Sequence, residues 1–242
     1  MLYIVATPIG NLGDFSHRGV QVLREADIIA CEDTRRTRIL LNRFEIPMPR
    51  LMISYREQTE HKAGSRLIQL LEAGETVALC TDAGYPGISD PGYRLICDAI
   101  ERGIQLQVIP GASAVPVALL ASGLPSSSYT FKGFPPRKSG AIRRFFEMEK
   151  DMPHSLTFFE SPMRLSKTLT LAAEVLGDRK AAVCIELTKK FESVSRGFLT
   201  DLIASFAGQE IKGEVTVVIA GSNPKFARSE NDVATEECQH DR

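Results

Sequence analysis

Several patterns that identify secreted, membrane-bound or metal-dependent proteins are missing from this 242-residue chain. The five cysteines are odd in number, widely spaced and without a C-x-x-C pair, so neither a disulfide framework nor a zinc site is indicated. The four histidines lie far apart in sequence, and we expect no metal. No segment approaches about 18 consecutive apolar residues, and the apolar start, Leu2–Thr7, has no basic leader. We therefore expect a cytoplasmic protein without a membrane anchor.

An excess of positive charge is also missing. The formal net charge is -1, so no global field attracts nucleic acid, and any RNA contact needs a local basic patch. Local clusters of basic residues do occur, at Arg35, Arg36, Arg38 and Arg43, at Arg137, Lys138, Arg143 and Arg144, at Arg164 and Lys167, and at Lys189 and Lys190. Such runs usually form a solvated helix face, but three that converged would supply contacts to phosphates.

The first half of the chain alternates short β-rich runs with amphipathic helical patterns. Strands are expected at Leu2–Ala6, Asp27–Cys31, Arg50–Ser54, Thr76–Thr81 and Gln105–Ile109, and helices at Ser16–Glu25, Arg35–Phe44, Glu57–Ala73 and Pro91–Arg102. Asp90 is expected to be the N-cap of the last helix, with Pro91 as its first residue. Five strands separated by such helices imply βαβ units and a mainly parallel sheet.

The pattern changes after a small-residue helix at Ala112–Ser122. Strands are then expected at Ser128–Phe134, Ser155–Phe159, Ala181–Glu186 and Glu214–Ala220, and helices at Ala141–Lys150, Arg164–Leu176 and Phe198–Ala207. The polar stretch Glu186–Arg196 is expected to be a site-forming loop. We expect two domains, 1–114 and 115–222, and a flexible tail, 223–242, which is polar and has no periodicity.

Three loops that follow strands are suited to contact with a ligand. Thr7–Asp14 matches neither G-x-G-x-x-G nor the P-loop pattern, and alone it reads equally well as a tight turn. Asp82–Gly92 holds two acids, three glycines and two prolines, which predict fixed φ angles and uncovered amides. Asp82 suits a ribose or an ammonium group, although it could merely cap a turn. In Ile109–Ala114, Ser113 stands at a helix start, where exposed N–H groups suit a carboxylate. Alternatively, Ser113 serves only as an N-cap with no ligand.

Together these segments resemble the tetrapyrrole (corrin and porphyrin) methylase superfamily, and within it the branch that methylates small-subunit ribosomal RNA. The motifs that carry the resemblance are Tyr3–Leu12, Glu32–Arg35, Asp82–Gly84, Gly87–Gly92, Ser122–Pro125, Glu160–Pro162, Arg164–Leu165, Glu186–Lys189 and Lys212–Glu214. The resemblance runs from Leu2 to about Gly221. The sequence departs from the family pattern at Arg56, Tyr85, Met163 and Phe191.

The resemblance implies a two-domain α/β fold, with a mainly parallel N-terminal sheet, a mixed C-terminal sheet and flanking helices. It also implies a homodimer that binds S-adenosylmethionine in the cleft between domains. The substrate would be 16S ribosomal RNA or the assembled small subunit, methylated on the ribose 2′-hydroxyl of a cytidine near the decoding site. By position, the donor would contact Pro8, Asp82, Gly84, Gly87, Ile88, Ser113, Ala114, Phe159, Thr188 and Glu214.

Transfer to a ribose hydroxyl needs a cation for the developing alkoxide, or a carboxylate or neutral lysine that takes the proton. The catalytic candidates are Lys189, Glu186 and Asp33, although Lys189 could form only a surface ion pair. Substrate-binding candidates are Arg35, Arg36, Arg56, Tyr85 and Arg164. Two other functions stay open: a methylase of a tetrapyrrole or other small acceptor, and a donor-binding ribosome-assembly factor without catalysis.

Overall fold

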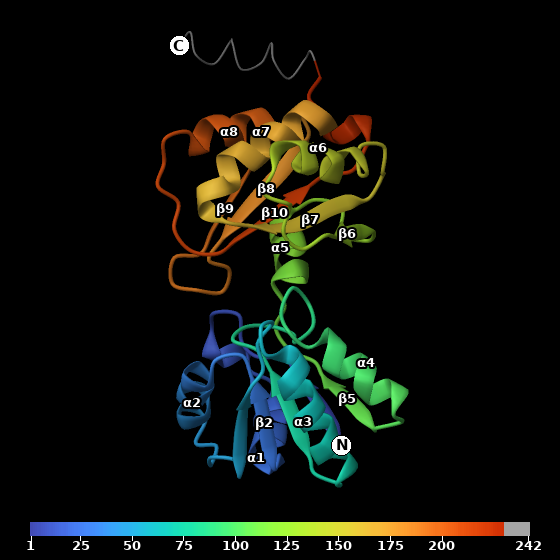
Figure 1. Cartoon of the computed structure of the whole chain (residues 1–242). Coiled ribbons are helices and arrows are strands. Elements are labelled where there is room, and N and C mark those ends of the chain that lie inside the picture. Colours follow the sequence, from blue (N-terminus) through green and yellow to red (C-terminus); the bar gives the residue numbers. More distant parts are fainter. Residues whose placement is uncertain (230–242) are drawn as a thin grey trace. The chain divides into compact units, whose positions relative to one another are not determined.

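The computed structural model describes residues 1–229, which form two compact units, Met1–Ser113 and a second that begins at Ala114 (Figure 1). Each unit contains its own five-stranded sheet. Met1–Ser113 is called the first unit, and the part that begins at Ala114 is called the second unit. None of the helices in residues 1–229 is long and apolar enough to cross a membrane.

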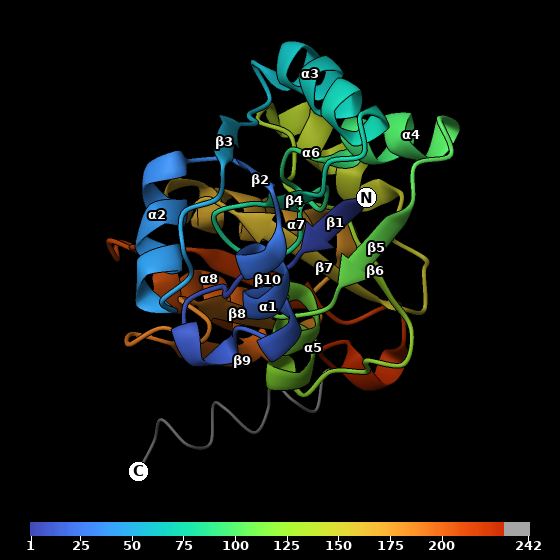
Figure 2. The ribbon, with the colours of Figure 1, turned by 90° about the horizontal axis from the view of Figure 1, so that it is seen from below.

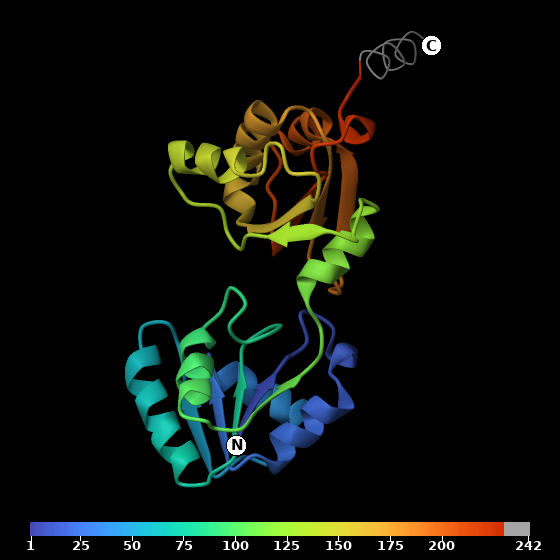
Figure 3. The ribbon, with the colours of Figure 1, turned by 90° about the vertical axis from the view of Figure 1, so that its right-hand side faces the viewer.

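The sheet of the first unit is entirely parallel, in the order β3-β2-β4-β1-β5. Its strands are β1 (Leu2–Val5), β2 (Ile28–Cys31), β3 (Leu51–Ser54), β4 (Val77–Cys80) and β5 (Leu106–Ile109). Helices α1 (His17–Glu25) and α2 (Thr34–Arg43) pack on one face, and α3 (Glu60–Glu72) and α4 (Tyr93–Glu101) on the other. Figures 2 and 3 show α3 and α4 side by side. Because helices cover both faces, β2 and β4 are buried along their whole length.

The strand order of the first unit creates a place for a ligand. Strands β1 and β4 are neighbours, but the chain leaves β1 through α1 toward β2, and leaves β4 through α4 toward β5. These two connections run over opposite faces of the sheet in opposite directions. Parallel sheets bind ligands outside the carboxyl ends of strands at such a switch point.

Helix α4 begins later than expected. Its N-cap is Gly92, at φ +148°, and its first bond runs from the Ile96 amide to the Gly92 carbonyl at 3.0 Å. The prediction that Asp90 is the N-cap and Pro91 the first helical residue is therefore wrong. The reason is that the Pro91 carbonyl accepts from the Gly87 amide at 3.2 Å, which folds the loop back on itself before the helix starts.

The second unit has a mixed sheet in the order β6-β7-β10-β8-β9, in which only β6 and β7 are parallel. Its strands are β6 (Tyr129–Phe131), β7 (Ser155–Glu160), β8 (Lys180–Ile185), β9 (Ser193–Phe198) and β10 (Val215–Ile219). Helices α6 (Ser139–Glu147), α7 (Leu165–Leu176) and α8 (Leu199–Phe206) cover one face, and α5 (Ala114–Ser122) packs on the other. The parallel first sheet and the mixed second sheet confirm the predicted α/β fold class.

Strand β9 occupies part of the stretch that we expected to be a loop, Glu186–Arg196, and that expectation is wrong from Ser193 onward. The strand lies at the edge of the sheet, and its residues are half-buried or exposed. Its polar sequence is tolerated there because, among residues 1–229, β8 is the one strand that pairs with it. Arg196 turns toward α5, where its guanidinium donates to the Ala121 carbonyl at 2.8 Å.

The chain remains folded beyond residue 222, where the predicted tail begins. Pro224–Phe226 form a turn of 3-10 helix, and Ala227 bridges to Arg179. Arg228 pairs with Asp178 at 2.9 Å and with Asp201, and lies over the Phe198 ring. These contacts fix the segment to the second unit. The remainder of the predicted tail, 230–242, lies outside the described residues.

Candidate functional site

The three loops singled out in the sequence join into one wall in the first unit. Thr7 and Gly84 exchange backbone hydrogen bonds, with the Thr7 amide donating at 2.9 Å and the Gly84 amide at 3.1 Å. The Tyr85 hydroxyl accepts from the Gly111 amide at 2.9 Å and donates to the Gly111 carbonyl at 3.4 Å. Gly84 therefore joins the loop after β4 to the loop after β1, the neighbouring strand. Tyr85 joins it to the loop after β5, the next strand beyond β1.

The amides of the Asp82–Gly92 loop are less available than expected. The Gly84 amide donates to Thr7, the Gly87 amide to Pro91, and the Ile88 amide to Tyr85 at 3.3 Å. The expectation of uncovered amides is therefore wrong for these three residues. Their bonds fix the shape of the loop, and contacts of these residues with a ligand would run through other atoms.

Two carboxylates and three arginines gather at the carboxyl ends of β2 and β4. Cys31 and Cys80 are register partners on these strands, so Asp33 and Asp82, two residues further on, emerge side by side. The Asp33 amide donates to Asp82 Oδ1 at 3.3 Å. We call Asp33, Arg35, Arg36, Arg56 and Asp82 the acid–arginine cluster.

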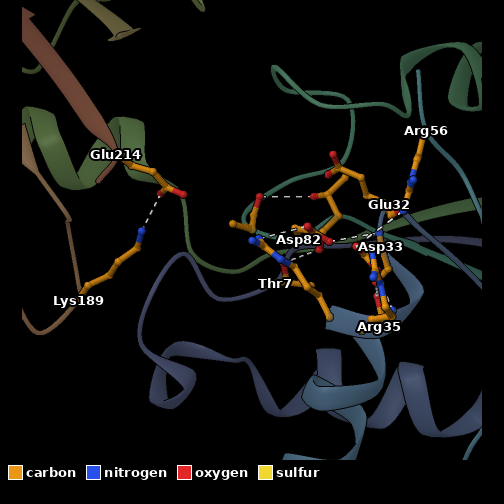
Figure 4. A network of polar contacts seen from close by, with 12 residues as sticks. Thr7, Glu32, Asp33, Arg35, Arg56, Asp82, Lys189 and Glu214 are labelled. Atoms are coloured by element: carbon orange, nitrogen blue, oxygen red, sulfur yellow. Dashed lines mark hydrogen bonds and ion pairs between the residues drawn. The ribbon is translucent and has the colours of Figure 1, made fainter. Parts of the chain in front are cut away.

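The arginines of this cluster bind its carboxylates while their guanidiniums stay open to solvent. Arg35 lies 3.3 Å and Arg56 3.7 Å from Asp33 Oδ2, and Figure 4 shows them approaching from opposite sides. Arg36 lies 3.2 Å from Asp82 Oδ2. The side chains of Arg35 and Arg36 are 81% and 72% exposed. Arg35 and Arg36 therefore keep guanidinium donors open to solvent beside the carboxylates that they pair with.

The local electrostatics of α2 favour an anion. Asp33 is the N-cap of the helix, and the Arg35 amide followed by the Arg35 guanidinium holds the pKa of Asp33 below its usual range. Asp33 is therefore ionised at neutral pH and is a weak base. Arg35 and Arg36 lie in the first turn, at the positive end of the helix dipole, where cations are disfavoured. A bound anion would relieve that repulsion.

A second charged group lies in the second unit, where Lys189 is held between two glutamates. Lys189 Nζ donates to Glu186 Oε1 at 2.8 Å and lies 3.1 Å from Glu214 Oε2, as Figure 4 shows for Glu214. Glu186 Oε1 also accepts from the Glu214 amide at 2.9 Å. We call Glu186, Lys189 and Glu214 the lysine clamp.

The clamp keeps Lys189 protonated. Burial alone would lower the pKa of Lys189, but the carboxylates of Glu186 and Glu214 outweigh burial and raise that pKa. The Lys189 ammonium and the Glu214 amide in turn lower the pKa of Glu186. The neutral-lysine alternative is therefore disfavoured, and Lys189 is available as a cation.

The clamp depends on a strained turn after β8. Glu186 and Thr188 both have left-handed backbone, at φ +53° and +65°, and buried Leu187 anchors the turn between them. Gly213 has φ +93°, where a side chain is strained, and a Cβ there would also collide with the Glu186 side chain unless that side chain moved. The Thr188 hydroxyl is buried without a hydrogen-bond partner among residues 1–229. Strained backbone and an unsatisfied buried hydroxyl together indicate a ligand site.

The remaining candidates fall into two groups. Phe159 packs edge-on against Phe131 with ring centroids 4.8 Å apart, and Ser113 and Ala114 stand at the start of α5. Arg164, in contrast, donates to the Pro135 carbonyl at 2.7 Å and pairs with buried Glu160 at 3.2 Å. The guanidinium of Arg164 stabilises this internal network, and we leave it out of the proposed substrate surface.

Three residues beside these groups were not among the predicted site residues: Gly213 and Leu12, which lie within motifs that carry the family resemblance, and Ile39. Gly213 makes room for Glu186, which lies far away in sequence and could not be paired with it beforehand. Ile39 was visible as an apolar residue on the polar face of α2, opposite buried Thr37 and Leu41. Among residues 1–229, no three His, Cys, Asp or Glu side chains are grouped to hold a metal.

The model of the family Tetrapyrrole (Corrin/Porphyrin) Methylases matches residues 1–203 of the chain. The chain belongs to this family. Two of its relatives carry the name Ribosomal RNA small subunit methyltransferase I. The relative from Halalkalibacterium halodurans is 45% identical over 95% of this chain and 78% of its own length. The relative from Mesorhizobium japonicum is 47% identical over 93% of this chain and 76% of its own length.

The fold of this methylase also resembles that of solved structures of low sequence identity. A crystal structure of diphthine synthase has a TM-score of 0.69 at 16% identity, and the match covers 93% of this chain and 95% of the other. A crystal structure of the methyltransferase CobJ has a TM-score of 0.68 at 15% identity, covering 91% of this chain and 94% of the other. These likenesses show the fold alone.

Proposed function

We propose that this methylase uses S-adenosylmethionine to methylate the ribose 2′-hydroxyl of a cytidine in 16S ribosomal RNA, near the decoding site. The names of relatives 45% and 47% identical to it support an rRNA substrate. The structural observation that carries the proposal is the acid–arginine cluster. Its exposed guanidiniums at a helix start suit the phosphates of an RNA strand.

The residues present fit a bound methyl donor. When bound, the donor supplies an electrophilic methyl group on a sulfonium, and transfer is an in-line displacement that depends on positioning. In the second unit, the buried Thr188 hydroxyl has no hydrogen-bond partner among residues 1–229 and would bond to the donor. Phe159 and Glu214 complete the proposed contacts of this unit. In the first unit, the proposed contacts are Pro8, Asp82, Gly84, Gly87, Ile88, Ser113 and Ala114.

We assign the chemical role to Lys189. Its ammonium would stabilise negative charge on the ribose oxygen while the hydroxyl proton passes to solvent water, in the manner of other preorganised donors. Glu186, whose pKa is lowered, acts by holding Lys189 in place rather than as the base. Asp33 likewise organises Arg35 and Arg56. Both acids thus become positioning residues in this proposal.

The proposal extends to location and assembly. We propose a cytoplasmic homodimer that acts on 16S ribosomal RNA or on the assembled small subunit, in line with the family resemblance. Arg35, Arg36 and Arg56 would contact phosphates of that subunit, and donor binding would be nearly independent of salt. Sedimentation of the purified protein tests the dimer, and a monomer at working concentration would contradict it.

The experiment is methylation of small subunits purified from a strain that lacks this gene. Labelled S-adenosylmethionine and the purified protein are added, and the labelled nucleoside is mapped. We expect label on the 2′-oxygen of one cytidine. Label on a base, or only in a small molecule, would contradict the proposal.

A further inference from the structure

A small cavity opens beside the acid–arginine cluster of the first unit. It has a volume of about 150 Å³, and its walls include Leu12 after β1, Arg36 and Ile39 on α2, and two residues that are also proposed to contact the donor, Pro8 after β1 and Asp82 after β4. A cavity of about 150 Å³ accepts one six-membered ring, as an engineered cavity that binds benzene shows. Sites for drug-sized ligands are larger, roughly 300–1,000 Å³, so this cavity suits a single ring rather than a macrocycle.

The lining combines apolar walls with one charged edge. Leu12 and Ile39 are 42% and 69% exposed, although both are large and apolar. Ile39 points away from the buried side of α2, so packing of the first unit does not explain it. Because Leu12 and Ile39 line the same cavity, their exposed apolar surfaces are placed to pack against an apolar part of a ligand. Arg36 and Asp82, 3.2 Å apart, supply the charged edge.

We propose that this cavity binds one unpaired cytosine base of the substrate RNA. Leu12 and Ile39 would pack against the ring faces, and the exocyclic amino group of the base would donate to Asp82. A carboxylate accepts from the amino group of cytosine but repels the carbonyl that uracil carries at the same place. The base must be unstacked to reach the cavity, which is how proteins commonly read single-stranded RNA.

The neighbouring charges suit the rest of a nucleotide. Arg36 is 72% exposed, so its guanidinium is able to stack on the base or turn to a phosphate. Arg35 lies one residue away and is 81% exposed. A base in the cavity would thus have phosphate contacts within reach of its own backbone. The inference rests on the proposed RNA substrate and adds a base-specific contact to it.

Binding of short single-stranded RNA tests the cavity directly. A labelled cytidine hexamer and a labelled uridine hexamer are titrated with the full-length protein, its Ile39→Ala variant and its Ile100→Ala variant. Ile100 is the matched control, since it is 61% exposed and lies on α4, away from the cavity. We expect Ile39→Ala to weaken cytidine binding roughly five-fold, from lost apolar contact, and Ile100→Ala to leave it unchanged.

The base preference gives a second readout. The unaltered protein should bind the cytidine hexamer more tightly than the uridine hexamer, and Asp82→Asn should reduce that difference. Equal binding of the two hexamers by the unaltered protein, or equal affinity of Ile39→Ala and the unaltered protein for cytidine, would overturn the proposal.

Methyl transfer separates this inference from the proposed function. Labelled S-adenosylmethionine and small subunits are used with the same proteins. Absence of label with the unaltered protein would overturn the proposed function, and the hexamers would still decide the cavity. Label with an unchanged KM for subunits in Ile39→Ala would overturn the cavity proposal alone. We expect that KM to rise while the dissociation constant of the donor is unchanged.

Discussion

The two units arrange opposite charges in different ways. In the first unit, the acid–arginine cluster exposes its cations, and Arg35 and Arg36 are 81% and 72% open to solvent. In the second unit, the lysine clamp encloses its cation, and the Lys189 side chain is 26% exposed between two carboxylates. Exposed cations remain available to an external anion, and enclosed ones are fixed in position.

This difference indicates a division of labour. Exposed arginines attract and orient a polyanion but are too mobile to define a reaction path. Glu186 and Glu214 hold the Lys189 ammonium in one position, and stabilisation of a transition state requires such a fixed charge. We therefore expect substitutions in the first unit's cluster to alter substrate binding, and substitutions in the clamp to alter the rate of transfer.

The largest effect is expected at Lys189. Lys189→Gln removes the cation, and loss of a preorganised donor of this kind lowers kcat by about 10²–10³. Lys189→Arg keeps the charge and should retain much more activity than Lys189→Gln. Steady-state kinetics measure both, with Lys190→Gln as the neighbouring control. If Lys189→Arg were as inactive as Lys189→Gln, Lys189 would act through more than its charge.

The next effect concerns the support of the clamp. Gly213→Ala would place a Cβ 2.4 Å from the Glu186 side chain and push that carboxylate away from Lys189. The control is Gly208→Ala, because Gly208 also has a positive φ, +71°, but open space around its Cβ position. Both variants should lose about 1 kcal/mol or more of stability from backbone strain. Only Gly213→Ala should also lose transfer activity, and equal activities of the two variants would contradict this account.

A smaller effect is expected in the salt dependence of subunit binding. If Arg36 contacts one phosphate, Arg36→Gln should reduce the slope of log affinity against log salt by about 1. Arg50→Gln is the control, since Arg50 is also exposed in the first unit but pairs with Glu75, outside the cluster. Binding titrations at several salt concentrations give the slopes. Identical slopes for Arg36→Gln and the unaltered protein would remove Arg36 from the substrate surface.

The smallest effect is expected at Tyr85, whose hydroxyl joins two loops. Tyr85→Phe leaves the Gly111 amide without its partner and should cost about 1 kcal/mol of stability. Tyr93→Phe is the control, because Tyr93 is 72% exposed on α4. Chemical denaturation measures the loss, and hydrogen exchange at the Gly111 amide should quicken only in Tyr85→Phe. Unchanged exchange would show that the hydroxyl does not hold the loops together.

The fold was largely predictable from sequence, because strands such as β2 and β4 are uninterrupted apolar runs buried on both faces. Strand β9 was missed because an edge strand needs no such run. The start of α4 was misplaced because a long-range turn, Gly87 to Pro91, decided it rather than the local signal of Asp90 and Pro91. Local patterns predict buried elements well and exposed boundaries poorly.

The site was predictable in its residues but not in their partners. Asp33 and Asp82 were each visible at strand ends, yet their contact depends on the pairing of β2 with β4. Tyr85 stays a predicted substrate contact, and the bond of its hydroxyl to Gly111 joins two loops whose pairing neither loop's sequence indicates. The Glu186–Gly213 contact links two distant loops, and neither of the motifs that contain these residues identifies the other as its partner. Such pairings arise only once the sheet order is known.

The most direct test of the division of labour is the effect of Arg36→Gln and Lys189→Gln on steady-state methylation of small subunits. Arg36→Gln should raise the KM for subunits with kcat nearly unchanged. Lys189→Gln should lower kcat with that KM nearly unchanged. A fall in kcat for Arg36→Gln, together with a rise in KM alone for Lys189→Gln, would contradict the account.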